Sequence, residues 1–193
     1  PLCLVGSEMC IRDSSDGASC VVLASDRIAR NLTDTPVWVK GSGAASDNLA
    51  LHDRPSITQL KATQAASQRA YAMADVSASH IDLAEVHDCF TIAEVLATED
   101  LGFAKRGEGG LFARNQEGRL NQGTTTVNAS GGLKSKGHPL GATGAGQVVE
   151  VFKQLRGEAE VGRQVRDAET ALTHNVGGSG ATCAVHVFGR NRP

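Results

Sequence analysis

Three reactive side chains stand next to each other in the segment EVHDCFTIAE, residues 85–94. His87 can exchange a proton near neutral pH, and Cys89 can act as a nucleophile or an acid/base through its thiolate. The thiolate is favoured if Cys89 lies in the first turn of a helix, where the helix amino terminus carries partial positive charge. A catalytic centre is one interpretation. The structural alternative makes Asp88 a helix N-cap and His87 a hydrogen-bonded histidine at a strand end.

Two further segments combine histidine with glycine. In NASGGLKSKGHPLGATG, residues 128–144, His138 precedes a proline, and the glycines and alanines that follow would let a ligand approach the backbone. In THNVGGSGAT, residues 173–182, a glycine-rich turn comes directly after His174 and Asn175. The backbone N–H groups of such a turn can form an oxyanion hole, or the turn can simply close a hairpin.

Familiar cofactor and metal motifs do not account for these segments. GATGAG lacks the G-x-G-x-x-G spacing of dinucleotide sites, and no Lys-Ser or Lys-Thr pair follows a GxxxxG as in a P-loop. A zinc site would have to draw on His87, Asp88, Cys89, His138 and His174. No pair among them has the i to i+3 or i+4 spacing of common zinc motifs, so no metal is expected.

Composition limits the classes of protein that the chain can represent. The 193 residues are 40% hydrophobic, and 19 basic and 21 acidic residues are interspersed to give a net charge of -2, so nucleic acid is not an expected partner. No apolar run approaches the ~20 residues of a membrane span, which predicts a cytoplasmic protein. The five cysteines fit neither a disulfide framework nor paired CxxC motifs, and Cys20 and Cys183 are predicted to be small buried hydrophobes.

Strand and helix patterns alternate along the chain and would position the three segments. The elements expected in chain order are a buried strand at 17–25, a helix at 26–32, a strand at 35–46, a helix within 56–76, a strand at 81–86, a helix at 91–102, a helix from 140 to 157, and a hairpin at 169–190. Twelve of the 22 glycines fall between Gly102 and Gly146, which predicts mostly loop there.

Two of these helices have apolar positions that predict which face is buried. Ser56 is the candidate N-cap of the first. Its expected packing residues are Ile57, Leu60, Ala65, Ala72 and Met73. Those of the second are Val148, Val149, Phe152 and Leu155.

Four segments together resemble a known family. SDGASCVVLAS, HDCF, NASGGLKSKGHPLGATG and HNVGGSGAT occur in the order and approximate spacing of the carboxy-terminal half of the thiolases, and look most like the sterol-carrier-protein type and its archaeal and bacterial relatives. The resemblance covers roughly residues 15–190. It implies an α/β, thiolase-like layered fold in which helices cover a mixed β-sheet, with the carboxy-terminal half only.

The same resemblance divides the chain into three parts. Residues 1–14, PLCLVGSEMCIRDS, resemble translated read-through of a sequencing adapter and are expected to be non-native. Residues 15–32 are expected to be the last strand and helix of the amino-terminal thiolase half. Residues 33–193 are expected to be the carboxy-terminal thiolase domain.

The resemblance also implies roles for the first two segments. Cys89 would be the acid/base at the substrate α-carbon, while the acyl-accepting cysteine lies in the amino-terminal half. His138 would take the proton of that cysteine and donate to a first oxyanion. His87, in place of the asparagine of better-known thiolases, would help to form that oxyanion hole, and Phe90 would line the slot for the pantetheine arm.

For the third segment, the resemblance implies an oxyanion hole without a cysteine. His174 and Val176 stand where better-known thiolases carry the cysteine and the glycine of Cys-x-Gly. Backbone N–H groups near Val176 and Gly177 would stabilise a second, tetrahedral oxyanion, and Asn175 belongs to the same loop.

The activity implied is that of an acyltransferase of the acetyl-CoA C-acyltransferase type, in lipid metabolism. It would catalyse thiolysis of 3-oxoacyl-CoA or the reverse Claisen condensation, with coenzyme A thioesters as substrates and no permanently bound cofactor. The segment alone is expected to be inactive, and the full-length protein to be a homodimer or homotetramer. Two alternatives stay open: a thiolase-like aldolase, which is a lyase with an OB-fold accessory protein, and a non-catalytic subunit that binds lipid thioesters.

Overall fold

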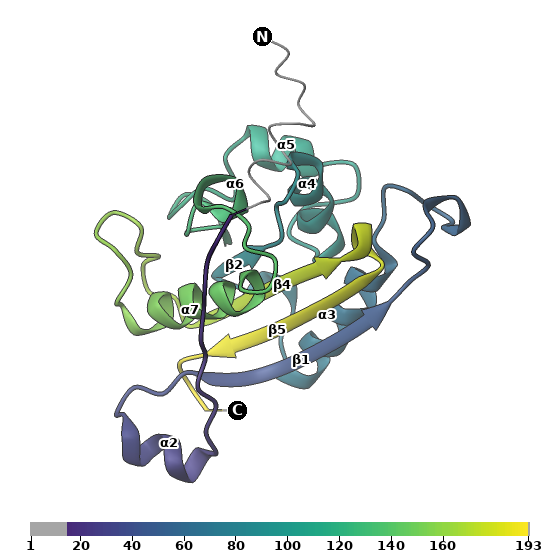
Figure 1. Cartoon of the computed structure of the whole chain (residues 1–193). Helices are drawn as coiled ribbons and strands as arrows, with labels where there is room; N and C mark the ends of the chain where they lie inside the picture. The colour runs from purple at the N-terminus through teal and green to yellow at the C-terminus, as the bar shows by residue number, and fades with distance from the viewer. Residues whose placement is uncertain (1–14, 193) are drawn as a thin grey trace.

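The computed structural model describes residues 15–192, which are organised around one mixed β-sheet (Figure 1). Its five strands are β1 (Trp38–Ser46), β2 (Leu83–Val86), β3 (Thr126–Val127), β4 (Thr170–Gly177) and β5 (Thr182–Gly189). The spatial order is β1-β5-β4-β2-β3, with β5 antiparallel to β1 and β4, and β2 parallel to β3 and β4. The predicted α/β class, the strands around β1 and β2 and the carboxy-terminal hairpin are therefore confirmed.

Helices lie on both faces of this sheet. They are α2 (Asp26–Leu32), α3 (Lys61–Ala74), α4 (Thr91–Asp100), α5 (Gly109–Arg114), α6 (Gly132–Lys136) and α7 (Thr143–Arg156), with 3-10 turns at Leu51–Asp53, Ala78–His80 and Gly178–Gly180. Figure 1 shows α3 behind the sheet and α7 in front of it. As predicted, α4 ends just before Gly102, which has φ +86°, and the region from Gly102 to Gly146 is mostly loop with short elements.

Helix α3 packs on β1 at very close range. A Cβ added to Gly41 would lie 2.1 Å from the carbonyl oxygen of Ala70, and one added to Gly43 would lie 2.0 Å from that of Ala66. Only glycine lets the helix backbone approach this strand so closely. The buried face of α3 consists of the small residues Ala62, Thr63, Ala66, Ser67, Ala70 and Ala74.

The predicted packing of α3 is therefore wrong in two respects. The helix begins at Lys61, and its N-cap is Leu60, four residues after the expected cap Ser56. Leu60 is buried as expected, but Ile57, Ala72 and Met73, which were also expected to pack, are exposed. Close packing selects small residues, so large apolar residues do not mark the buried face here.

Helix α7 covers the other face with both polar and apolar residues. Its buried residues are Thr143, Gln147, Glu150, Val151, Gln154 and Leu155. Of the expected packing residues, Leu155 is buried, while Phe152 is 39% exposed. Val148 also packs against the apolar cluster that contains Leu83 and Leu155. The predicted apolar face is thus partly confirmed, although buried hydrogen-bonding residues share it.

The segment before α2 is extended but does not form the predicted strand. Residues 17–25 have no strand partner among the described residues, and Val22 and Leu23 are mostly exposed. Cys20 is exposed, contrary to prediction, whereas Cys183 is buried in β5 as expected. A strand needs a neighbour to satisfy its N–H and C=O groups, and an apolar pattern alone cannot supply one. Residues 1–14 lie outside the described part of the chain.

Candidate active site

The candidate site lies where β2 and β4 reach their carboxyl ends. The two strands are parallel and paired up to Val86 and His174, so the turn that follows β2 begins beside the last residues of β4. His87 opens that turn, and Asn175 follows in β4. Helix α7 begins nearby, and a Cβ on its Gly144 would lie 3.7 Å from the Asn175 side chain.

His87 and His138 are packed against each other although 51 positions separate them in the sequence. Their ring centroids are 4.8 Å apart and the ring planes meet at 87°, an edge-to-face arrangement. Both residues are buried. Burial, and to a lesser extent the neighbouring His138, lowers the pKa of His87 to about 4, so His87 is neutral near pH 7.

Hydrogen bonds determine which nitrogen of His138 carries its proton. The Thr143 hydroxyl lies 2.6 Å from His138 Nδ1 and donates its own hydrogen to the Pro139 carbonyl, 3.1 Å away. Thr143 must therefore accept from Nδ1–H, which leaves the lone pair on Nε2. The main-chain N–H of His138 is held by the Ser15 hydroxyl at 2.8 Å. In a neutral ring, Nε2 is then the nitrogen that can accept a proton.

A chain of amides sets the opposite arrangement in His87. Gln147 Nε2 donates to the carbonyl of residue 174 at 3.0 Å, so its Oε1 accepts from Asn175 Nδ2 at 3.3 Å. Asn175 Nδ2 therefore also donates to His87 Nδ1, 3.2 Å away. Because Nδ1 accepts in a neutral ring, the proton of His87 is on Nε2. His87 is thus a donor and His138 an acceptor.

His174 lies below this pair, on the α3 face of the sheet. Its ring is completely buried, and burial, followed by the nearby His87, lowers its pKa to about 3. Its Nδ1 accepts the main-chain N–H of His87 at 3.5 Å, and its Nε2 lies 3.0 Å from the Thr63 hydroxyl. Both ring nitrogens of His174 thus have hydrogen-bond partners in the core, and the bond to the main-chain N–H of His87 holds the start of the turn from the α3 face.

The backbone beyond His174 has N–H groups on two sides. Strand β4 pairs with β5 as far as Gly177, but with β2 only as far as His174. Successive N–H groups in a strand point to opposite sides. One of the N–H groups of Val176 and Gly177 therefore points toward β5, and the other toward the side on which β2 has ended and the turn at 87–90 begins.

Cys89 and Phe90 complete that turn. Cys89 is half-buried and precedes α4, whose N-cap is Phe90. The cysteine therefore lies just before the first helical turn, whereas the prediction placed it within that turn. Phe90 is 40% exposed, and Lys134 Nζ lies 6.0 Å from the centre of its ring. The phenyl ring thus forms part of the exposed surface next to the buried histidines.

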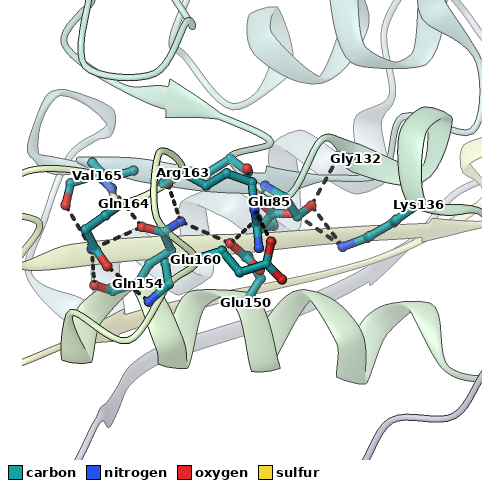
Figure 2. Close-up of polar contacts among 12 residues, drawn as sticks. Glu85, Gly132, Lys136, Glu150, Gln154, Glu160, Arg163, Gln164 and Val165 are labelled. Atoms are coloured by element: carbon teal, nitrogen blue, oxygen red, sulfur yellow. Dashed lines mark hydrogen bonds and ion pairs between the residues drawn. The ribbon is translucent and has the colours of Figure 1, made fainter.

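A network of buried polar contacts lies on the α7 face of the sheet (Figure 2). The Glu85 carboxylate is almost fully buried and accepts from the N–H and the hydroxyl of Ser130, at 3.0 and 2.5 Å, with Lys136 Nζ at 3.6 Å. Burial raises the pKa of Glu85, and Lys136 opposes this. Further along α7, Glu150 pairs with Arg163 at 2.9 Å.

Sequence patterns do not single out several of these supporting residues. Gln147, Glu150 and Gln154 recur at helical spacing, which is the one signal that could have marked a buried polar stripe on α7. Thr143 is part of the GATG run, but nothing in its type marks it as the partner of His138. Among residues 15–192, no group of three or more His, Cys, Asp or Glu is placed to hold a metal ion.

The fold and site together define an α/β protein whose polar site, containing two histidines in edge-to-face contact, lies at the carboxyl ends of neighbouring parallel strands. The family described as Thiolase C-terminal domain-like matches residues 43–190. The chain belongs to this family, as the sequence motifs predict. No helix within residues 15–192 is long and apolar enough to span a membrane.

Relatives in sequence and structure agree with this assignment. An acetyl-CoA acetyltransferase of Methanothermobacter thermautotrophicus is 54% identical over 91% of this chain and 45% of its own length. Sterol carrier protein 2 of Bos taurus is 38% identical over 87% of this chain and 32% of its own. A solved structure titled Ltp2-ChsH2(DUF35) aldolase matches with a TM-score of 0.76 and 24% identity, over 88% of this chain and 44% of that one, which shows the shared fold. The chain thus spans less than half the length of these proteins.

Proposed function

We propose that this chain is the carboxy-terminal, acid/base half of an acyl-CoA thiolase that catalyses thiolysis of 3-oxoacyl-CoA or the reverse Claisen condensation. The observation that carries the proposal is the pair of His87 and His138, which are in contact and hold opposite tautomers. A neutral hydrogen-bond donor, His87, beside a second histidine that can accept a proton suits a reaction that must stabilise an oxyanion and move a proton at the same place.

The first half-reaction is acyl transfer. A cysteine outside this chain attacks the thioester carbonyl, a carbon–sulfur bond to that cysteine forms, and the carbon–sulfur bond to coenzyme A breaks. His138 Nε2 takes the proton of the cysteine and passes it to the departing coenzyme A thiolate. A positioned acid/base of this kind contributes ~10²- to 10⁴-fold.

The second half-reaction joins the carbon atoms. The Cys89 thiolate removes a proton from the α-carbon of a second thioester, and the carbanion attacks the acyl-cysteine as its carbon–sulfur bond breaks. The proton held by Cys89 then returns to the departing cysteine thiolate by way of His138. The His87 Nε2–H donates to the thioester oxygen of the carbanion form, and a backbone N–H of Val176 or Gly177 donates to the tetrahedral oxyanion.

The remaining residues take supporting roles in this scheme. Asn175 and His174 hold His87 through its Nδ1 and its main-chain N–H, respectively. Phe90 borders the slot for the pantetheine arm. Coenzyme A thioesters are the substrates, and no permanently bound cofactor is required. A cytoplasmic homodimer or homotetramer in lipid metabolism is the proposed setting, and size-exclusion chromatography with light scattering would test the assembly.

The proposed reaction can be tested on the complete polypeptide that contains this segment. Acetoacetyl-CoA and coenzyme A should be converted to acetyl-CoA. The conversion can be measured as a loss of the absorbance of the acetoacetyl-CoA enolate. His138→Asn should lower kcat by ~10²- to 10⁴-fold. Cleavage of an aldol thioester without any thiolysis would instead identify a lyase, in which an OB-fold accessory protein is the expected partner. Acyl-CoA binding without either reaction would identify a non-catalytic subunit.

A further inference from the structure

Asp88 makes contacts that its place in the sequence does not predict. Asp88 is only 2% exposed, yet it does not cap α4, the helix that follows it. Instead, Oδ1 accepts the main-chain N–H of Leu133 at 2.7 Å, and Oδ2 lies 3.4 Å from that of Lys134. The carboxylate therefore holds α6, about 45 residues further along the chain.

Glycine allows this carboxylate to reach α6. Gly132, the first residue of α6, has φ +67°, and a Cβ added there would lie 2.2 Å from Asp88 Oδ2. The backbone and the carboxylate are thus in direct contact, and the contact fixes both partners.

Helix α6 connects this contact to the catalytic pair. Asp88 directly follows His87, and α6 ends at Lys136, two residues before His138. One end of this short rigid unit is thus fixed by Asp88, and the other end leads into the His138 loop. This connection thus joins the Asp88 contact to both rings, whose centroids lie 4.8 Å apart.

We propose that Asp88 is a positioning residue that sets the distance between His87 and His138, an inference that rests on the proposed function. Asp88 touches neither ring in this scheme and acts through α6. Misplacing a catalytic group by about 1 Å can cost roughly 10²-fold in rate, so a shift of α6 should lower kcat more than it changes KM.

Other contacts hold the start of the same loop independently of Asp88. Asn128 Oδ1 accepts the main-chain N–H of Val86 at 2.8 Å, and Ser130 is held by Glu85. Removing the Asp88 carboxylate should therefore release α6 without detaching the whole loop from β2.

The chain contains a matched control at the other end of β2. Asp82 Oδ2 accepts the main-chain N–H groups of Glu169 and Thr170, each at 2.8 Å. This is the same kind of bridge from a carboxylate to two backbone N–H groups, but it precedes β2 and lies away from the histidines. Asp82→Ala should therefore cost stability without changing the geometry of the site.

The experiment compares Asp88→Ala, Asp88→Asn and Asp82→Ala in the complete polypeptide. Asp88→Ala should lower kcat by roughly 10²-fold with KM within about threefold. Asp88→Asn, which keeps one acceptor for Leu133, should lose only about tenfold, and Asp82→Ala should keep the wild-type kcat. NMR with labelled histidine should show a ring-to-ring cross-peak between His87 and His138 in the wild type and in Asp82→Ala that is lost in Asp88→Ala.

Three outcomes would overturn the proposal. They are a kcat within twofold of wild type in Asp88→Ala, an equal loss in Asp82→Ala, and an unchanged histidine cross-peak in Asp88→Ala. If Asp88→Ala does not fold, Asp88→Asn decides by the same two measurements. If the wild type catalyses no thiolysis, the proposed function fails, while the cross-peak still tests the role of Asp88.

Discussion

The two faces of the β-sheet are packed by different means. On the α3 face, glycines of β1 meet alanines of α3 at backbone contact, and the aliphatic side chains of β2, β4 and β5 fill the rest. On the α7 face, a smaller apolar cluster that includes Val151 and Leu155 is joined by the buried polar residues Gln147, Glu150 and Gln154. Figure 2 shows Glu150 and Gln154 in the polar network that also contains Glu85. The first face secures the position of the strands. The second directs the side chains at their carboxyl ends, because each of its hydrogen bonds has a defined direction.

His174 and Asn175 show this difference in consecutive residues. Successive side chains of β4 point to opposite faces, so the His174 ring enters the α3 core while Asn175 meets Gln147 of α7. His174 holds the backbone of His87, whereas Asn175 sets its tautomer. Disturbing the α3 face should therefore cost stability, and disturbing the α7 face should cost mainly geometry at the site.

The largest effect is expected on the α3 face, from Gly43→Ala. The new methyl group would lie 2.0 Å from the backbone oxygen of Ala66, so a strand or a helix must move. The free energy of unfolding should fall by at least about 3 kcal/mol, the upper part of the range for overpacked cores, as measured by urea denaturation. The control is Gly110→Ala in α5, where a methyl group meets no atom within 4 Å and stability should be kept. Equal stability of both variants would contradict the close packing.

Acid should weaken the same face through His174. Its pKa of about 3 in the folded protein is below the ordinary 6.5, so the unfolded state binds more protons between these values, and stability falls as the pH falls. Between pH 7 and pH 4, His174 should account for a loss of about 3 kcal/mol. Urea denaturation of wild type and His174→Gln across this range isolates the effect, because the variant should lose less. Identical pH dependence would exclude His174 as its source.

A smaller effect on stability, but a specific one on the site, is expected from Gln147→Leu. The substitution removes the donor to the carbonyl of residue 174 and the acceptor that orients Asn175. Stability should fall by about 1–3 kcal/mol, as for a buried group left unsatisfied. The proton of His87 should also spread over both ring nitrogens, which ¹⁵N chemical shifts would report.

Gln154→Leu is the matched control on the same face of α7. Gln154 is equally buried and binds the 163–165 segment, away from His87. The Gln154→Leu substitution should lower the free energy of unfolding by about as much as Gln147→Leu, without changing the ¹⁵N chemical shifts of His87. If Gln154→Leu changes those shifts as Gln147→Leu does, the directing role of Gln147 is wrong.

The smallest effect is expected at the exposed end of α7. Glu158 accepts from Arg156 at 2.8 Å, and its side chain is 49% exposed, so water screens the pair. Glu158→Gln should leave the urea midpoint unchanged within error. A clear loss of stability would show that surface pairs, and not only the buried contacts, hold α7 in place.

The sequence predicts the elements of this fold better than their packing. Alternating patterns around Trp38 and Leu83 predict strands correctly, because a half-buried or buried strand has a direct composition signal. The strand expected at 17–25 fails since pairing depends on a neighbour that the pattern does not specify. The predicted buried face of α3 is wrong because glycines in a different element, β1, determine which α3 residues fit against the sheet.

For the candidate site, too, the sequence indicates which residues take part but not how they are arranged. Reactive residue types and a family resemblance suffice to select His87 and His138, and the family assignment is confirmed. The tautomers of the two rings depend on Thr143, Gln147 and Asn175, whose hydrogen bonds exist only once α7 lies on the sheet. Cooperative hydrogen-bond networks of this kind are properties of the folded arrangement and leave little trace in residue type.

The central claim, that this chain supplies the acid/base half while the nucleophile lies outside it, is tested most directly by Cys89→Ala in the complete polypeptide. After incubation with acetyl-CoA, mass spectrometry of the digested variant should find one acetyl group on a cysteine outside residues 15–192. No acetoacetyl-CoA should form, because the base for the α-carbon is missing. Loss of acetylation in Cys89→Ala, or an acetyl group on Cys89 in the wild type, would contradict the account and make Cys89 the nucleophile.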